Sequence, residues 1–121
     1  MRFMQLQGFT IRFDREVEFQ RWVTANEERI RRSYPEGNEF DGIYTAVFSS
    51  EKRAGEYFWV DILDSYAALD KGAAAAKDPT GDLAKLIGEF LEFIETDLIA
   101  GSSNILLKSV VDATVFNAPV R

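Results

Sequence analysis

Apolar and aromatic residues gather in four segments with the period of two that is typical of β-strands. Between these segments, apolar residues recur at helical spacing, and Asp78-Pro79-Thr80-Gly81 interrupts the second helical region. Asp14 and Ser65 are predicted helix N-caps because both residue types accept backbone hydrogen bonds there. The pattern predicts strands over residues 3–13, 43–49, 56–64 and 105–116, and helices over 15–34, 65–76 and 82–98.

This order of elements is β-α-β-β-α-β, with the second helical region broken in two. It is typical of the ferredoxin-like α+β fold, so we predict an antiparallel four-stranded sheet covered by one set of helices. The 121 residues have the size of one ordinary domain, and no linker composition divides them. We therefore predict a single domain over residues 1–121.

The third predicted strand carries large side chains on both of its faces. Phe58, Val60 and Ile62 point to one side, and we expect the helices to cover them. Trp59 and Asp61 point to the other side, which we expect the helices to leave open. Such a face is too apolar for water and too polar for a pure core, so it fits a dimer interface around a pocket.

The composition excludes several classes of function. The hydrophobic fraction of 46% and charged fraction of 28% are those of a soluble globular protein. A net charge of −6 argues against nucleic-acid binding, which needs clustered cations. The chain has no cysteine and no histidine, so thiolate chemistry and the usual zinc and haem ligands are absent, and we predict no metal and no cofactor. No apolar run reaches ~20 residues and no signal peptide is apparent, so we expect no membrane contact and a cytoplasmic location.

The element order of nearly the whole chain resembles that of the dimeric α+β barrel superfamily. The most specific part is the run of residues 57–69, YFWVDILDSYAAL, which is similar to the aromatic third strand and helix start of that group. The superfamily includes proteins related to antibiotic-biosynthesis monooxygenases and to stress-responsive barrels. The resemblance implies a homodimer in which two protomers pair their sheets face to face and close a dimeric α+β barrel.

The strand faces that we expect to lie open carry aromatic and charged side chains. Asp61 is the candidate catalytic base, because a carboxylate in an apolar pocket has a raised pKa. Arg12 or Lys108 would bind an acidic or carbonyl group. The same residues also fit an interface core in which Arg12 or Lys108 pairs with Asp61 or Asp112, without any chemistry. The candidate ligand-binding residues are Trp59, Tyr57, Tyr44, Arg12, Lys108, Phe48 and Asp112.

Two functions follow from these interpretations. The first is binding, or cofactor-free oxidation or isomerisation, of a small aromatic or polyketide-like molecule, with the chemistry implied by the resemblance. The alternative is a non-enzymatic structural or protein-interaction module whose sheet face serves only dimerisation. Free volume distinguishes them, since an enzyme needs a cavity of at least ~300 Å³ bordered by Asp61 or Arg12. The sequence leaves open whether the protein is an enzyme.

Overall fold

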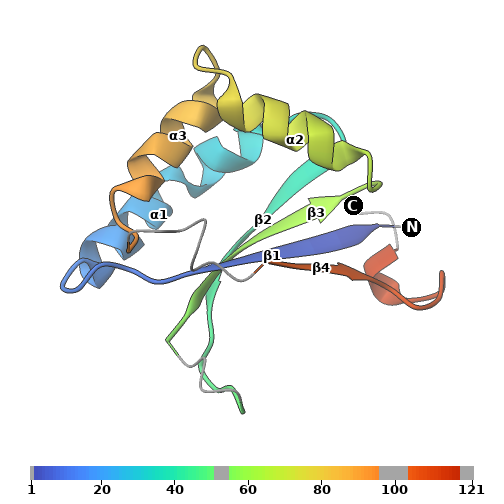
Figure 1. The fold of residues 1–121 in the computed structure, drawn as a ribbon, viewed down its shortest axis with the longest axis horizontal. Coiled ribbons are helices and arrows are strands. Elements are labelled where there is room, and N and C mark those ends of the chain that lie inside the picture. The colour runs from blue at the N-terminus through green and yellow to red at the C-terminus, as the bar shows by residue number, and fades with distance from the viewer. Residues whose placement is uncertain (1, 51–54, 96–103, 118–121) are drawn as a thin grey trace.

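Three helices lie over one side of a four-stranded sheet in the computed structural model, which describes residues 2–50, 55–95 and 104–117 (Figure 1). The sheet order is β2-β3-β1-β4, and every neighbouring pair is antiparallel. This confirms the predicted ferredoxin-like α+β fold with its second helical region broken in two. The elements are β1 (Phe3–Phe9), α1 (Glu16–Ser33), β2 (Asn38–Thr45), β3 (Tyr57–Leu63), α2 (Ala68–Lys77), α3 (Asp82–Leu91), β4 (Asn104–Lys108) and a 3₁₀ turn, η1 (Val115–Asn117).

Both predicted helix caps are wrong. Asp14 has a φ of 64°, in the left-handed region that Asp tolerates, and Arg15 takes the N-cap position of α1 without a side-chain hydrogen bond. The carbonyl oxygen of Ser65 accepts a hydrogen bond from the N–H of Ala68, so a turn precedes α2 and the helix begins three residues later than predicted. In both cases a local turn takes the place of the expected cap.

Several predicted elements are longer than those that form. β1 ends at Phe9, and Ile11 then makes only an isolated bridge to Ile94. β4 ends at Lys108 and α3 at Leu91, whereas the predictions reached residues 116 and 98 (residues 96–98 lie outside the described residues). The strand predicted over residues 43–49 is β2, which begins and ends earlier. Apolar alternation continues past these points, but a strand also needs a neighbour to pair with, and β4 pairs with β1 over only five residues.

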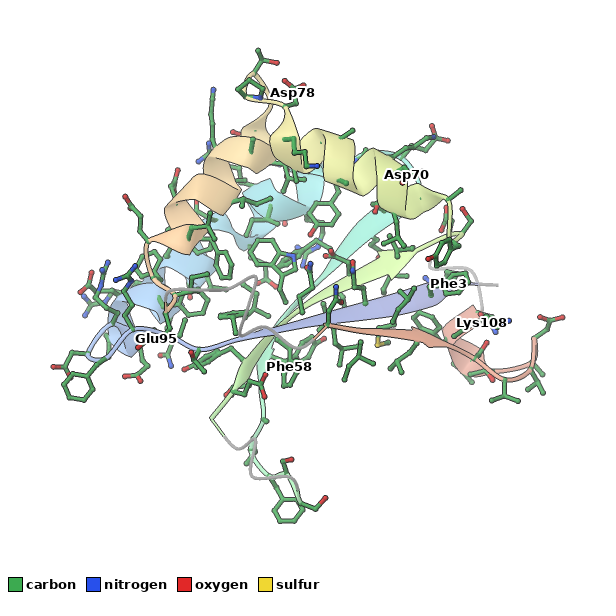
Figure 2. All side chains as sticks on the ribbon, in the orientation of Figure 1. Phe3, Phe58, Asp70, Asp78, Glu95 and Lys108 are labelled. Atoms are coloured by element: carbon green, nitrogen blue, oxygen red, sulfur yellow. The ribbon has the colours of Figure 1, made fainter. Side chains whose placement is uncertain are left out.

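The helices cover the side of the sheet opposite to the predicted one. Trp59 is buried in a core with aromatic side chains of α1 and α3, and its ring centroid lies 4.9 Å from that of Phe90. Phe9 belongs to the same cluster, and its ring centroid lies 5.8 Å from that of Phe19 and 4.8 Å from that of Phe90. The prediction that helices cover Phe58 was therefore wrong (Figure 2). Large rings reach across the gap between sheet and helices, which smaller β-branched side chains would leave unfilled.

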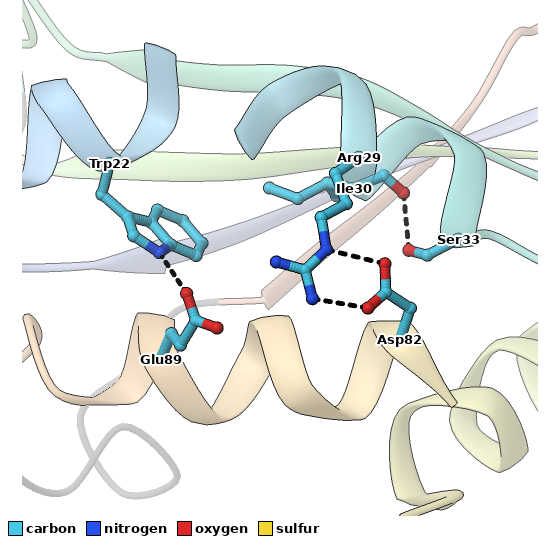
Figure 3. A network of polar contacts seen from close by, with 6 residues as sticks. All are labelled: Trp22, Arg29, Ile30, Ser33, Asp82 and Glu89. Carbon is cyan, nitrogen blue, oxygen red and sulfur yellow. Dashed lines mark hydrogen bonds and ion pairs between the residues drawn. The ribbon is translucent and has the colours of Figure 1, made fainter. Parts of the chain in front are cut away.

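Polar contacts fix α1 against α3 (Figure 3). The guanidinium of Arg29 donates from Nε and Nη2 to the two carboxylate oxygens of Asp82, at 2.8 and 2.6 Å. Farther along the same pair of helices, Nε1 of Trp22 donates to Oε1 of Glu89 at 2.8 Å. These bonds join helices more than fifty residues apart and set α3 beside α1, above the sheet.

The other side of the sheet carries apolar side chains that none of the three α-helices covers. The strand register places them in rows across β4, β1 and β3. Val60 and Ile62 are buried at the centre, while Leu107 on the edge strand is 46% exposed. We call this surface the outer face; its members are Met4, Leu6, Phe58, Val60, Ile62, Ile105 and Leu107.

Candidate functional site

A cavity of about 630 Å³ lies between the sheet and helices α2 and α3. Its floor comes from β1, β3 and the start of β4, one end from the segment between α1 and β2, and its roof from the two helices. The lining residues are Gln5, Gln7, Phe9, Tyr34, Pro35, Asn38, Trp59, Asp61, Leu69, Gly72, Ala73, Ala76, Leu83, Ile87, Phe90, Leu91 and Asn104. Its volume falls in the range of small-molecule sites.

Three hydrogen-bonded side chains form the polar centre of this cavity. The hydroxyl of Tyr34 donates to Oδ1 of Asp61 at 2.5 Å. The indole Nε1–H of Trp59 points at both partners, 2.7 Å from the Tyr34 hydroxyl oxygen and 3.1 Å from Oδ1 of Asp61. Both donors converge on the same carboxylate oxygen. Among the described residues no hydrogen bond reaches Oδ2 of Asp61, so this oxygen can accept a hydrogen bond from a ligand.

Burial sets the protonation of this centre. It raises the pKa of Asp61 to about 6, although the hydrogen bonds from Tyr34 and Trp59 oppose the shift by stabilising the carboxylate. Burial, followed by the nearby negative charge of Asp61, also raises the pKa of Tyr34. Near neutral pH, Asp61 is therefore ionised and Tyr34 keeps its proton. A carboxylate whose pKa lies close to the working pH is suited to act as a general base.

The sequence places these groups together by two local rules. Trp59 and Asp61 are two residues apart on β3, so they share a face. Tyr34 directly precedes Pro35, which disfavours helical backbone in the residue before it, and Tyr34 is extended at the end of α1. Its ring then packs against Phe40, with ring centroids 5.8 Å apart. Sequence reasoning missed Tyr34, although an aromatic residue directly before a helix-ending proline is a signal that could have drawn attention to it.

Small residues of α2 create the free space of the cavity. Gly72 lies so close to β2 that an added Cβ would come within 2.9 Å of Oδ1 of Asn38. The same Asn38 donates from Nδ2 to the carbonyl oxygen of Ala68 at 3.1 Å, which holds the start of α2 over the sheet. Beyond this contact, Ala73 and Ala76 line the cavity with single methyl groups. Close docking at Gly72 and short side chains beyond it leave a hollow under the helix.

Trp59 and Asp61 are the two predicted site residues that line this cavity. Tyr57 lies on the same side of the sheet but packs into the core, where its ring stacks on Phe9 with centroids 5.8 Å apart. Tyr44 lies on the opposite side of the sheet, since its strand partner is Phe58, and its hydroxyl donates to Asp41.

The remaining predicted residues do not line the cavity, and all four are exposed: Arg12, Phe48, Lys108 and Asp112. The hydrogen-bond partners of Asp61 are Tyr34 and Trp59, so neither Arg12 nor Lys108 forms the predicted pair with it. The cavity also lies on the helix-covered side of the sheet, whereas the predicted pocket lay between the sheets of two protomers. The cause is the inverted assignment of the two faces of β3.

Metal-ligating clusters and membrane-spanning helices are both absent from the described residues. Within them, no cluster of three or more carboxylates could hold a metal ion. None of the helices in that part of the chain is long and apolar enough to cross a membrane.

Solved structures with a similar fold include NIPSNAP proteins and a cofactor-independent oxygenase. A NIPSNAP family protein of unknown function from Agrobacterium tumefaciens is 16% identical with a TM-score of 0.61, over 89% of this chain and 87% of that one. An uncharacterised NIPSNAP-like domain protein from Burkholderia xenovorans is 10% identical with a TM-score of 0.64, over 99% and 91%. A mutant of SnoaB, a cofactor-independent oxygenase from Streptomyces nogalater, is 12% identical with a TM-score of 0.56, over 93% and 97%. No family model and no curated protein matches the sequence.

These likenesses cover nearly the full length of the chain, and they confirm the predicted resemblance at the level of the fold. The protein has the ferredoxin-like α+β fold. Identities of 10–16% show the fold alone.

Proposed function

We propose that the protein binds a small aromatic or polyketide-like molecule in the cavity under α2 and α3, and that Asp61 acts there as the base for cofactor-free oxidation or isomerisation. One observation carries this proposal. A half-buried carboxylate lies in a cavity of about 630 Å³ with one oxygen fixed by two donors and the other without a described partner. The fold is shared with a cofactor-independent oxygenase, which supports the reaction class by analogy.

The geometry supports a division of roles among three residues. Oδ2 of Asp61 would remove a proton from a phenol or an acidic carbon of the bound molecule. Tyr34 and Trp59 hold Oδ1, which orients the carboxylate and limits the rise of its pKa. The resulting electron-rich substrate would react with molecular oxygen in an oxidation, or accept a proton at another carbon in an isomerisation. The aromatic rings of Trp59 and Phe90 would contact the flat part of the substrate.

Three variants test this proposal against a screen of hydroxylated polycyclic aromatic compounds. Ala76→Leu fills the cavity, and Ala74→Leu is its control, because Ala74 is exposed on the same helix and does not line the cavity. Calorimetric titration should show binding lost in Ala76→Leu and kept in Ala74→Leu. Asp61→Asn should keep binding and lose at least about a hundredfold in turnover, the usual contribution of a general base. If Ala76→Leu bound a compound as tightly as Ala74→Leu does, the assignment of the site to this cavity would be contradicted.

The outer face supports a second part of the proposal, a homodimer. Ile105 and Leu107 are exposed on the edge strand β4, in the same cross-strand rows as the buried Val60 and Ile62. A second copy of the chain would cover these exposed side chains. In sedimentation, the protein should be a dimer at micromolar concentration and Leu107→Glu a monomer. Val17→Glu is the control, since Val17 is 60% exposed on the helical layer. A monomeric parent protein would refute the dimer.

The non-enzymatic interaction module remains the alternative, and it too has an observation in its favour. Tyr44 is 53% exposed beside Phe58, so an aromatic group extends the outer face toward β2. If the protein dimerises through this face and no compound in the screen binds the cavity, the outer face would be its functional surface.

A further inference from the structure

The described lining of the cavity offers no cation to an acidic ligand. Asp61 is the one charged residue among the described residues that line it. Lys108 and Arg12, the predicted partners of an acidic or carbonyl group, are exposed and lie outside the lining. The polar remainder of the lining is neutral: one tyrosine hydroxyl, the Trp59 indole N–H, and the amides of two glutamines and two asparagines.

An anion in this cavity would therefore meet a like charge and no described counter-charge. Coulomb repulsion between two unit charges a few ångströms apart remains strong when water is partly excluded. The chain as a whole carries a net charge of −6, which adds a weaker repulsion that salt screens. A carboxylate or phosphate would also lose its hydration on entry without an ion pair to replace it.

Hydrogen bonding sets a second condition on the ligand. Oδ1 of Asp61 already accepts from Tyr34 and Trp59, and Oδ2 can only accept while the carboxylate is ionised. A ligand that presents an N–H or O–H to Oδ2 would satisfy it, whereas a ligand without a donor would leave a desolvated charge unpaired. The neighbouring walls are apolar, from Phe90 and Ile87 to the methyl group of Ala76, and suit an aromatic or aliphatic frame.

We propose that the cavity selects uncharged ligands that carry an N–H or O–H donor on an apolar frame, and that it rejects carboxylates and phosphates of the same shape. This inference rests on the proposed function of the cavity as a small-molecule site. It narrows the substrate class by charge and by hydrogen-bond donor, and it assigns recognition of the ligand to Asp61, whereas the sequence predicted that Arg12 or Lys108 binds an acidic or carbonyl group.

Three probes on one ring system separate the two conditions: 2-naphthamide, methyl 2-naphthoate and 2-naphthoate. The amide is neutral with a donor, the ester is neutral without one, and the acid is an anion at about pH 8. Affinities are measured by calorimetric titration of the whole protein. The indole N–H signal of Trp59 in NMR spectra locates binding, and Trp22→Phe assigns it because the chain has two tryptophans. The amide should bind at least about tenfold more tightly than the naphthoate, with the ester between them.

Asp61→Asn tests the cause of this selection, because it removes the charge and keeps the shape. In this variant the naphthoate should gain about tenfold in affinity, while the amide changes much less. Asp64→Asn makes the same change in net charge at an exposed position just beyond β3, and should leave the ratio of the two affinities unchanged. A buried structural role of Asp61 would not alter this ratio.

The possible outcomes separate this inference from the function on which it rests. If the naphthoate binds at the Trp59 site as tightly as the amide, or if Asp61→Asn leaves their ratio unchanged, selection by charge is refuted and the small-molecule site stands. If none of the three probes shifts the Trp59 signal, both the site and its selectivity are refuted. Tighter binding of the amide, with a ratio that falls in Asp61→Asn alone, would support both.

Discussion

Replacing Asp61 with Asn should stabilise the protein at about pH 8 and have little effect at about pH 4. Burial raises the pKa of this carboxyl from 3.8 to about 6, so the folded protein binds its proton more tightly than the unfolded chain does. The stabilisation by this proton is fully present below about pH 4, and it is lost as the pH rises through 6. Above that window, the buried carboxylate weakens folding relative to its neutral form.

The size of the change in unfolding free energy follows from the pKa shift of Asp61. About two pKa units correspond to about 3 kcal/mol of unfolding free energy between the two ends of the window. Asn resembles the neutral carboxyl in size, and its amide oxygen can still accept from Tyr34 and Trp59. Asp61→Asn should therefore be up to about 3 kcal/mol more stable than the parent at about pH 8, which raises Tm by about 10 °C for a domain of this size.

Thermal unfolding followed by circular dichroism at a series of pH values measures this difference. All samples are compared at one protein concentration, because a dimer has a concentration-dependent Tm. Asp64→Asn, with the same change in net charge at an exposed site, serves as the control and should follow the parent protein. Lower stability of Asp61→Asn than of the parent at about pH 8, or an equal difference at both ends of the pH range, would contradict the raised pKa of Asp61. A gain in stability together with a loss of turnover would indicate that the carboxylate is retained for function.

Three further outcomes are expected. Tyr34→Phe removes a donor to Oδ1 and should raise the pKa of Asp61 above 6 by about one unit, as measured by carboxyl NMR titration; an unchanged value would contradict the hydrogen bond. Trp59→Ala should lose about 3–5 kcal/mol of stability and all ligand affinity, whereas Trp22→Ala should keep affinity, so equal loss of affinity in both would place Trp59 in the ordinary core. Arg29→Ala should lower Tm only slightly, and less so in high salt, because its ion pair with Asp82 is solvent-exposed; a large, salt-independent decrease would refute this.

Local rules account for the parts of the fold that the sequence predicted. Periods of two and of 3.6 separate the strands from the helices, and their order along the chain restricts the topology to the ferredoxin-like sheet that forms. The same period of two places Trp59 and Asp61 on one face of β3. The two-residue spacing of Trp59 and Asp61 is therefore part of the reason that both line one cavity.

The sequence could not decide which face of β3 the helices cover. Alternation distinguishes two faces by composition, and both faces of β3 are apolar enough to be buried. The choice depends on long-range packing, in which Phe19 of α1 and Phe90 of α3 meet Trp59 and Phe9 across the gap. Strand ends at Phe9 and Lys108 also depend on partners far away in the chain, which periodicity does not show.

The candidate site also depends in part on the sequence and in part on the tertiary structure. By itself, the sequence determined the fold class, the absence of histidine and cysteine chemistry, and the shared face of Trp59 and Asp61. The tertiary structure alone brought Tyr34 to Asp61 from 27 positions away and left a cavity beside them under α2. The physical reason is that hydrogen bonds and free volume are created when distant elements pack together, whereas periodicity and composition are local properties of the chain.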